Sequence, residues 1–114
     1  MSKTNLVIVI FSFNLQLQQR CIVSKNPNKY SELISEITSD SSSIEQSLEQ
    51  LFQSHVKLGY GWTKPMLFDV IKQEDINIYY TCSIPPETEL IDTYYVSSNI
   101  AIINKEVRKA MLYA

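Results

Sequence analysis

Two glutamates form the first pattern in this sequence that could do chemistry. Glu45 and Glu49 are four residues apart, so on a helix both carboxylates would project from one face. Carboxylate oxygens of this kind hold Mg²⁺, but such a site needs a third acid, for which Glu32, Glu36 and Asp40 are the nearest candidates. Because like charges at this spacing repel only mildly, a solvated surface tolerates them. We therefore interpret the pair as a solvated helix face, with the remnant of a metal site as the alternative.

The only histidine and the two cysteines give a second, weaker pattern. His55 could activate a thiol of Cys21 or Cys82, but nothing in the sequence brings these side chains together. A histidine in the last turn of a helix is stabilised by the helix dipole, and we prefer that interpretation. The cysteines form no CxxC pair, so free buried thiols are favoured, with a disulfide left open. We therefore predict no catalytic residue, no metal ligand and no cofactor-binding residue.

Aromatic residues could recognise a base or a protein partner. Adjacent tyrosines on a strand point to opposite faces, so one of each pair can be exposed. Exposed Tyr and Trp side chains stack on nucleotides or anchor protein partners, although packing within the sheet explains most such residues. The predicted interaction surface consists of Tyr60, Trp62, Tyr80 and Tyr95.

Composition narrows the class of protein. The 114 residues are 45% hydrophobic and 19% charged, with a net charge of -2 and no cluster of Lys and Arg, so a nucleic-acid-binding face is not indicated. The apolar run after Lys3 is short and lacks a cleavage pattern, which favours a buried strand over a signal peptide. Nothing approaches the ~20 apolar residues of a membrane span. We expect one domain over residues 1–114 in a cytoplasmic, soluble protein; the Ile, Asn, Lys, Ser and Tyr content suggests an AT-rich genome such as a phage's.

The helix that carries the glutamates is predicted from SIEQSLEQLFQSH and the residues around it. Its apolar stripe comprises Ile44, Leu48, Leu51, Phe52 and Val56. Small polar residues precede it and can cap it, and Ser42 with Glu45 has the spacing of a capping box. The following GYGW is expected to end the helix.

The other elements must form a sheet that covers this stripe. Residues 30–38 fit either a helix or a strand, and Asn104 is expected to cap a last helix that carries Val107, Ala110 and Met111. The order predicts a single α/β domain with a mixed sheet flanked by helices. Strands are predicted at residues 6–13, 15–23, 66–71, 76–84 and 93–96, the first two joined as a hairpin near Asn14.

This order of elements resembles the Nudix fold. VIVIFSFNLQLQQRCIV is similar to the family's first hairpin, INIYYTCSIP to its central strand and TYYVSSNIAIINKEVRKAML to its closing strand and helix. A profilin-like or longin-like domain is the alternative topology. The resemblance implies that the helix with Glu45 and Glu49 stands where the family keeps its catalytic helix, whose glutamates hold Mg²⁺ on a diphosphate.

The family's catalytic box does not match well at this helix. With its Arg-Glu-Leu placed on residues 49–51, the two closing glutamates fall on Gln53 and Ser54, the early glutamate on Ser41 and the glycine on Ser35. A shift of one residue places the closing acids on Ser54 and His55. Gln and Ser bring no negative charge, so the resemblance implies a Nudix-like shell without the metal-binding carboxylates.

These observations predict a non-catalytic interaction or regulatory module that binds a protein partner through its surface. Its role as a small subunit of a larger complex fits this prediction. One alternative is a divergent Mg²⁺-dependent hydrolase of nucleoside-diphosphate-linked substrates that uses acids outside the family's usual helix; loss of turnover in Glu45→Gln or Glu49→Gln would locate its site. Another is a nucleotide sensor that binds without turnover.

Overall fold

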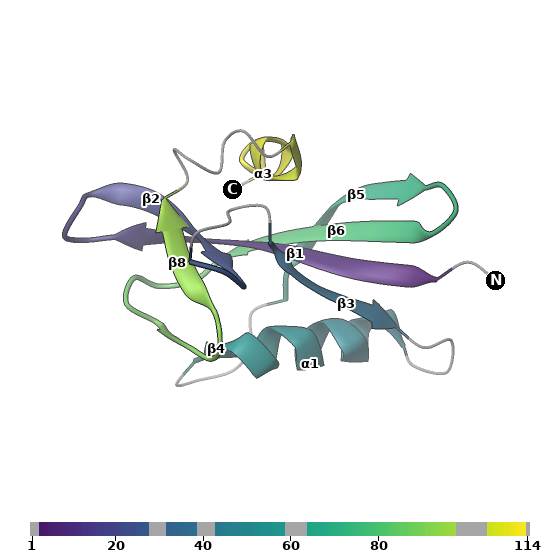
Figure 1. The fold of residues 1–114 in the computed structure, drawn as a ribbon, viewed down its shortest axis with the longest axis horizontal. Helices are drawn as coiled ribbons and strands as arrows, with labels where there is room; N and C mark the ends of the chain where they lie inside the picture. The colour runs from purple at the N-terminus through teal and green to yellow at the C-terminus, as the bar shows by residue number, and fades with distance from the viewer. Residues whose placement is uncertain (1–2, 28–31, 39–42, 59–63, 98–104, 114) are drawn as a thin grey trace.

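A computed structural model describes residues 3–27, 32–38, 43–58, 64–97 and 105–113 (Figure 1). Most of its strands belong to one six-stranded sheet of order β5-β6-β1-β2-β8, in which β3 also pairs with β1. The strands are β1 (Thr4–Asn14), β2 (Gln19–Ser24), β3 (Ile34–Thr38), β4 (Val56–Lys57), β5 (Met66–Lys72), β6 (Ile76–Ser83), β7 (Glu89–Leu90) and β8 (Tyr94–Ser97), and the helices are α1 (Ile44–His55) and α3 (Lys105–Ala110).

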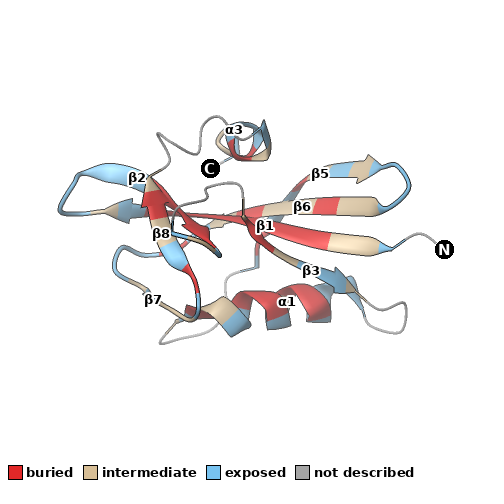
Figure 2. Ribbon diagram, viewed as in Figure 1, coloured by how far each residue is buried: buried red, intermediate tan, exposed pale blue. Residues whose placement is uncertain are grey.

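Strand β1 is the centre of the sheet. It runs parallel to β6 from the Thr4–Ile76 pair to the Phe11–Ser83 pair. On its other side β1 pairs antiparallel with β3 along its first half and with β2 along its second half. One long strand thus pairs along one edge with two shorter strands. Its sequence is apolar almost throughout because both of its faces are covered (Figure 2).

The two helices cover opposite faces of this sheet (Figure 1). Leu6, Ile8 and Ile10 pack into one core with residues of α1, and we call this the α1 side of the sheet. Val7, Val9 and Phe11 alternate with them and pack into a second core with α3, on the α3 side. The prediction of a mixed sheet flanked by helices is therefore confirmed.

Helix α1 matches the predicted segment SIEQSLEQLFQSH, except that Val56 of the predicted stripe lies in β4. Its N-cap is Ser43, whose hydroxyl accepts a hydrogen bond from the Gln46 N–H at 3.1 Å. The backbone becomes extended at Val56, where β4 pairs with β7, so the helix ends before the GYGW segment. Ile44 was expected in the buried stripe but is 42% exposed, because the first turn lies at the rim of the core. Leu48, Leu51 and Phe52 are buried as predicted.

The predicted strands need three corrections. Residues 15–18 form a turn rather than part of a strand, and Gln18 has a positive φ of 51° there. The segment 30–38, whose spacing fits either a helix or a strand, contains β3, because its backbone pairs with β1. The short strands β4 and β7 escaped prediction, since two residues each carry no pattern. Ser42, the GYGW segment and Asn104 lie outside the described residues.

Among the described residues, no helix is long and apolar enough to cross a membrane.

Candidate functional site

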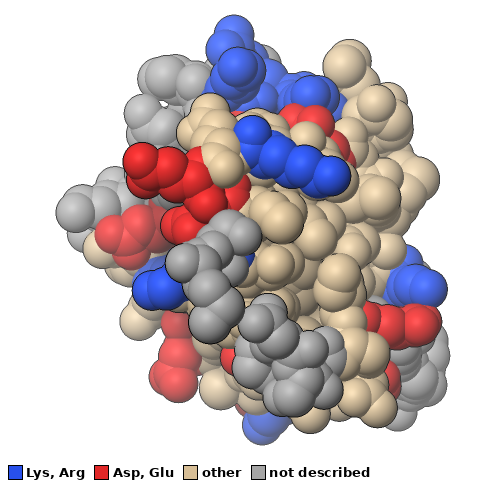
Figure 3. Space-filling view, turned by 90° about the vertical axis from the view of Figure 1, so that its right-hand side faces the viewer, with Lys and Arg blue, Asp and Glu red and all other residues tan. Residues whose placement is uncertain are grey.

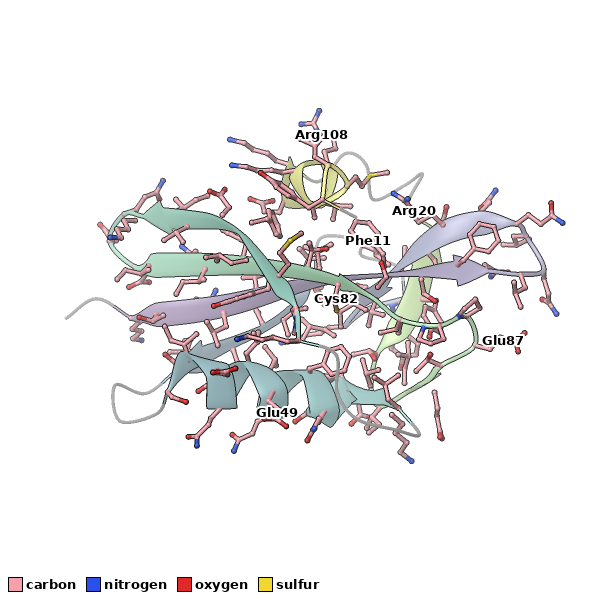
Figure 4. The ribbon with its side chains drawn as sticks, turned by 180° about the vertical axis from the view of Figure 1, so that it is seen from behind. Phe11, Arg20, Glu49, Cys82, Glu87 and Arg108 are labelled. Atoms are coloured by element: carbon pink, nitrogen blue, oxygen red, sulfur yellow. The ribbon has the colours of Figure 1, made fainter. Side chains whose placement is uncertain are left out.

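The acids of α1 lie on the part of the helix turned away from the sheet core. Glu45 is exposed, and its carboxylate lies 2.8 Å from the Lys64 Nζ. The hydrogen bond and charge of Lys64 lower the pKa of Glu45, and the same contact raises the pKa of Lys64. Glu49 accepts a hydrogen bond from the Gln53 amide at 3.3 Å and is labelled in Figure 4. Glu45 is thus engaged with a cation of the chain itself.

The positions that the box would fill with acids are occupied by exposed neutral residues. Gln50, Gln53 and Ser54 all face solvent, and the Ser54 hydroxyl donates to the Gln50 carbonyl at 2.7 Å. Ser35 lies in β3, while Asp40 and Ser41 fall outside the described residues. Within the described part of the chain, His, Cys, Asp and Glu side chains form no group of three or more that could hold a metal ion.

The structure does not arrange His55 and the cysteines as a nucleophile pair. The Nδ1 atom of His55 lies 3.0 Å from the Ile91 carbonyl oxygen. Both cysteines are free; burial raises the pKa of the Cys82 thiol to about 12 and also raises the pKa of Cys21. Both groups are therefore protonated at neutral pH, and a protonated thiol is a poor nucleophile.

The described members of the predicted aromatic surface are half-buried rather than fully exposed. Tyr80 packs against the core on the α1 side. Tyr95 does the same with its ring, and its hydroxyl donates to the Thr88 carbonyl at 2.7 Å. Tyr60 and Trp62 lie outside the described residues. The exposed member of the Tyr94–Tyr95 pair is Tyr94, at 48%, because Tyr95 faces the core.

A pocket lies over the α3 side of the sheet, and we call it the sheet pocket. Its volume is about 370 Å³. Val7 and Leu33 of the α3-side core form its apolar part. The Lys25 ammonium, at its rim, donates to the Ser35 carbonyl at 3.1 Å. The lining comprises Asn5, Val7, Lys25, Glu32, Leu33, Ser35, Tyr79 and Glu106.

Tyr79 gives the sheet pocket an aromatic wall. Its ring packs near that of Phe68, with a centroid distance of 6.0 Å. Burial raises the pKa of Tyr79, as do the charges of Glu106 and Asp69, so the phenol keeps its proton and stays a hydrogen-bond donor. The sequence does not predict this pocket, because its residues come from separate elements. The alternation along β1, which turns Asn5 and Val7 to the same face, was the one available signal.

A second pocket, of about 250 Å³, lies at the β1–β2 hairpin, and we call it the hairpin pocket. Tyr95 contributes to it, so one residue of the predicted interaction surface does line a concave site. Its lining comprises Phe13, Asn14, Leu15, Gln16, Cys21, Glu87 and Tyr95.

This chain resembles known proteins in its fold but not detectably in its sequence. No protein-family model matches the chain, and no curated protein matches it. Solved structures do match. The NUDIX domain of Shewanella oneidensis NrtR, in complex with ADP ribose, gives a TM-score of 0.70 at 9% identity, over 99% of this chain and 88% of that one. The fold is Nudix-like.

Two further structures agree with this result. A Caenorhabditis elegans Ap4A hydrolase gives a TM-score of 0.63 at 7% identity, over 97% of this chain and 96% of that one. A MutT/nudix family protein from Enterococcus faecalis gives 0.62 at 12% identity over 83% of this chain, which spans only 43% of that protein. The predicted Nudix-like resemblance is confirmed for the fold.

Proposed function

We propose that this Nudix-like chain is a regulatory or interaction module that binds a nucleoside-diphosphate-linked ligand in the sheet pocket and does not turn it over. The sheet pocket is the observation that carries the proposal. Its volume of about 370 Å³ lies near the lower end of the ~300–1,000 Å³ range of ligand pockets. That volume suits one nucleoside moiety, with the rest of the ligand extending over the rim.

The residues around the sheet pocket suit a ribose-containing ligand. Tyr79 supplies an aromatic surface against which a base can stack, and Lys25 supplies the positive charge that a phosphate needs. Glu32 and Glu106 supply carboxylates that accept hydrogen bonds from ribose hydroxyls or from an exocyclic amine. Because these acids repel a bare polyphosphate, the pocket favours a ligand such as ADP ribose, the molecule bound in the NrtR domain.

The residues of α1 support binding without turnover. Hydrolysis of a diphosphate by the Nudix route would need several carboxylates around Mg²⁺. Here Gln50, Gln53 and Ser54 carry no charge, and Glu45 is held by Lys64. In addition, α1 packs on one face of the sheet, whereas the sheet pocket opens on the other. These features favour a binding module over the divergent hydrolase.

Thermal unfolding with a ligand panel tests this proposal. ADP ribose and diadenosine tetraphosphate would each be added with and without Mg²⁺, because a ligand that binds only the folded chain raises its melting temperature. We expect ADP ribose to stabilise the wild type, and Lys25→Ala to weaken binding by roughly tenfold through loss of a charge-assisted hydrogen bond. Lys57→Ala, which removes an exposed lysine paired with Glu89, is the matched control and should bind normally.

The same samples are then analysed for products by chromatography. Binding with intact ligand supports the proposal. Mg²⁺-dependent products that disappear in Glu45→Gln or Glu49→Gln would establish the hydrolase instead, and the absence of binding by either ligand would also contradict the proposal.

A further inference from the structure

The β1–β2 hairpin holds apolar side chains out into solvent. Phe13, Leu15 and Leu17 are 42%, 53% and 65% exposed, and the end of the hairpin projects beyond the helices (Figures 1 and 2). The Leu17 N–H donates to the Asn14 side chain at 2.9 Å, which stabilises the turn. Turns are usually built from small or polar residues, so large apolar side chains here indicate a contact surface.

The hairpin pocket adjoins these side chains on the α1 side of the sheet. Cys21 is 5% exposed, and its thiol stays neutral because burial raises its pKa. The Tyr95 hydroxyl is bonded to the Thr88 carbonyl, which fixes the ring at the pocket. A volume of about 250 Å³ is below the ~300 Å³ at which small-molecule pockets begin, and suits one or two side chains of a partner.

The lining of the hairpin pocket carries a single, negative charge. Glu87 is the charged residue of the lining, which contains no Lys or Arg, and Figure 4 shows it on the loop beside the hairpin. The Glu87 backbone has a φ of 63°, a left-handed conformation that is unfavourable for an L-residue, so the surrounding loop must fix the backbone at this position. Asp92, further along the same connection, is also exposed and acidic.

We propose that the hairpin pocket and the exposed Leu15 dock a partner polypeptide in which an apolar side chain stands next to Lys or Arg. The apolar side chain would enter the pocket, and the cation would meet the Glu87 carboxylate and the aromatic ring of Tyr95. A phosphate-bearing ligand is disfavoured, because no cation lines the pocket. This surface is separate from the sheet pocket, so the inference stands whether or not a nucleotide binds there.

Fluorescence anisotropy with a labelled model peptide tests this inference. The probe is Lys-Phe-Lys-Leu-Lys; its comparators are Glu-Phe-Glu-Leu-Glu, which reverses the charge, and Lys-Ser-Lys-Ser-Lys, which removes the apolar side chains. We expect the probe to bind at least tenfold more tightly than either comparator. Leu15→Ser should weaken its binding by about tenfold and Glu87→Gln by roughly threefold, the latter with a weaker dependence on salt.

Two variants serve as matched controls. Ile37→Ser removes an apolar side chain that is 59% exposed on β3, and Glu74→Gln removes an exposed acid of the β5–β6 turn; both should bind the probe like the wild type. Equal binding of all three peptides, no binding, or no effect of Leu15→Ser would overturn the inference. So would a concentration-dependent dimer that Leu15→Ser abolishes in light scattering, since the occupant would then be a second copy of this chain.

Discussion

The Nζ atom of Lys109 in α3 lies 2.8 Å from the Oδ2 atom of Asp69 in β5, and this ion pair connects α3 to an edge strand of the sheet. Figure 3 shows Lys and Arg side chains gathered at the top of one face, where α3 lies. The Lys109 hydrogen bond is the main cause that lowers the pKa of Asp69. The helix that covers the second core is therefore held by apolar packing of Val107 and Ala110 and by this polar contact.

Stability should depend on pH through Asp69. A carboxylate with a lowered pKa stabilises the fold above its unfolded value, about 3.9, and that contribution disappears as pH falls through the lower folded value. Asp69→Asn should therefore lower the melting temperature at pH 7, and the difference from wild type should vanish in acid below both pKa values. Glu74→Gln, an exposed acid of the β5–β6 turn, is the control. A difference that stays constant down to low pH would contradict this role.

Burial should decide how much stability is lost when a side chain of the α1 stripe is truncated to alanine. Leu48 is 1% exposed, so Leu48→Ala should lower the free energy of unfolding by roughly 2–5 kcal/mol. Ile44 is 42% exposed, and Ile44→Ala should cost no more than about 0.5–1 kcal/mol. Urea unfolding of both variants measures the difference. Equal costs would show that Ile44 is part of the core, as the sequence pattern suggested.

Two serines of α1 should respond oppositely to alanine. Ser43 caps the helix, so Ser43→Ala should destabilise the chain by about 1 kcal/mol. Ser54 donates to the Gln50 carbonyl of its own helix, a bond that competes with helix geometry, so Ser54→Ala should be neutral or slightly stabilising. Helicity by circular dichroism and urea unfolding distinguish the two. A large loss in Ser54→Ala would mean that its hydroxyl has another partner.

The thiols should react slowly in the folded chain. Burial raises the pKa of Cys82 to about 12, so at pH 8 almost none of it is thiolate. We expect a disulfide reagent to modify Cys82 quickly only after unfolding in denaturant, and the Cys82→Ser variant to show which signal belongs to Cys21. Cys82 is half-buried whereas Cys21 is buried, so rapid modification of Cys82 at pH 8 without denaturant would contradict the raised pKa of its thiol.

Much of the fold could be predicted from local patterns. The apolar run of β1 and the stripe through Leu48 and Phe52 each reflect burial that the structure confirms. Tyr79 and Tyr80 pack on opposite faces of the sheet, as alternation predicts, but both are half-buried and neither is exposed. Residues 30–38 could not be decided, because only pairing with β1 selects a strand there. The alternation of Leu15 and Leu17 predicts a strand, whereas both residues lie in an exposed turn. Alternation alone does not distinguish one face of a sheet from such a turn.

The candidate site was harder to predict than the fold. Glu45 and Glu49 form a recognisable pattern because they are close in sequence, whereas the sheet pocket is assembled from residues as distant as Asn5 and Tyr79. Such a site has no signature in spacing and becomes visible only when the strands are paired. That the box carboxylates are missing remains a prediction from the sequence and requires a biochemical test.

The most direct test of ligand binding without turnover is a calorimetric titration of ADP ribose into the wild type with Mg²⁺ present, followed by chromatography of the contents of the cell. We predict saturable binding that Tyr79→Leu weakens, with all of the ADP ribose recovered intact. Recovery of AMP and ribose phosphate, or the absence of any binding, would contradict it.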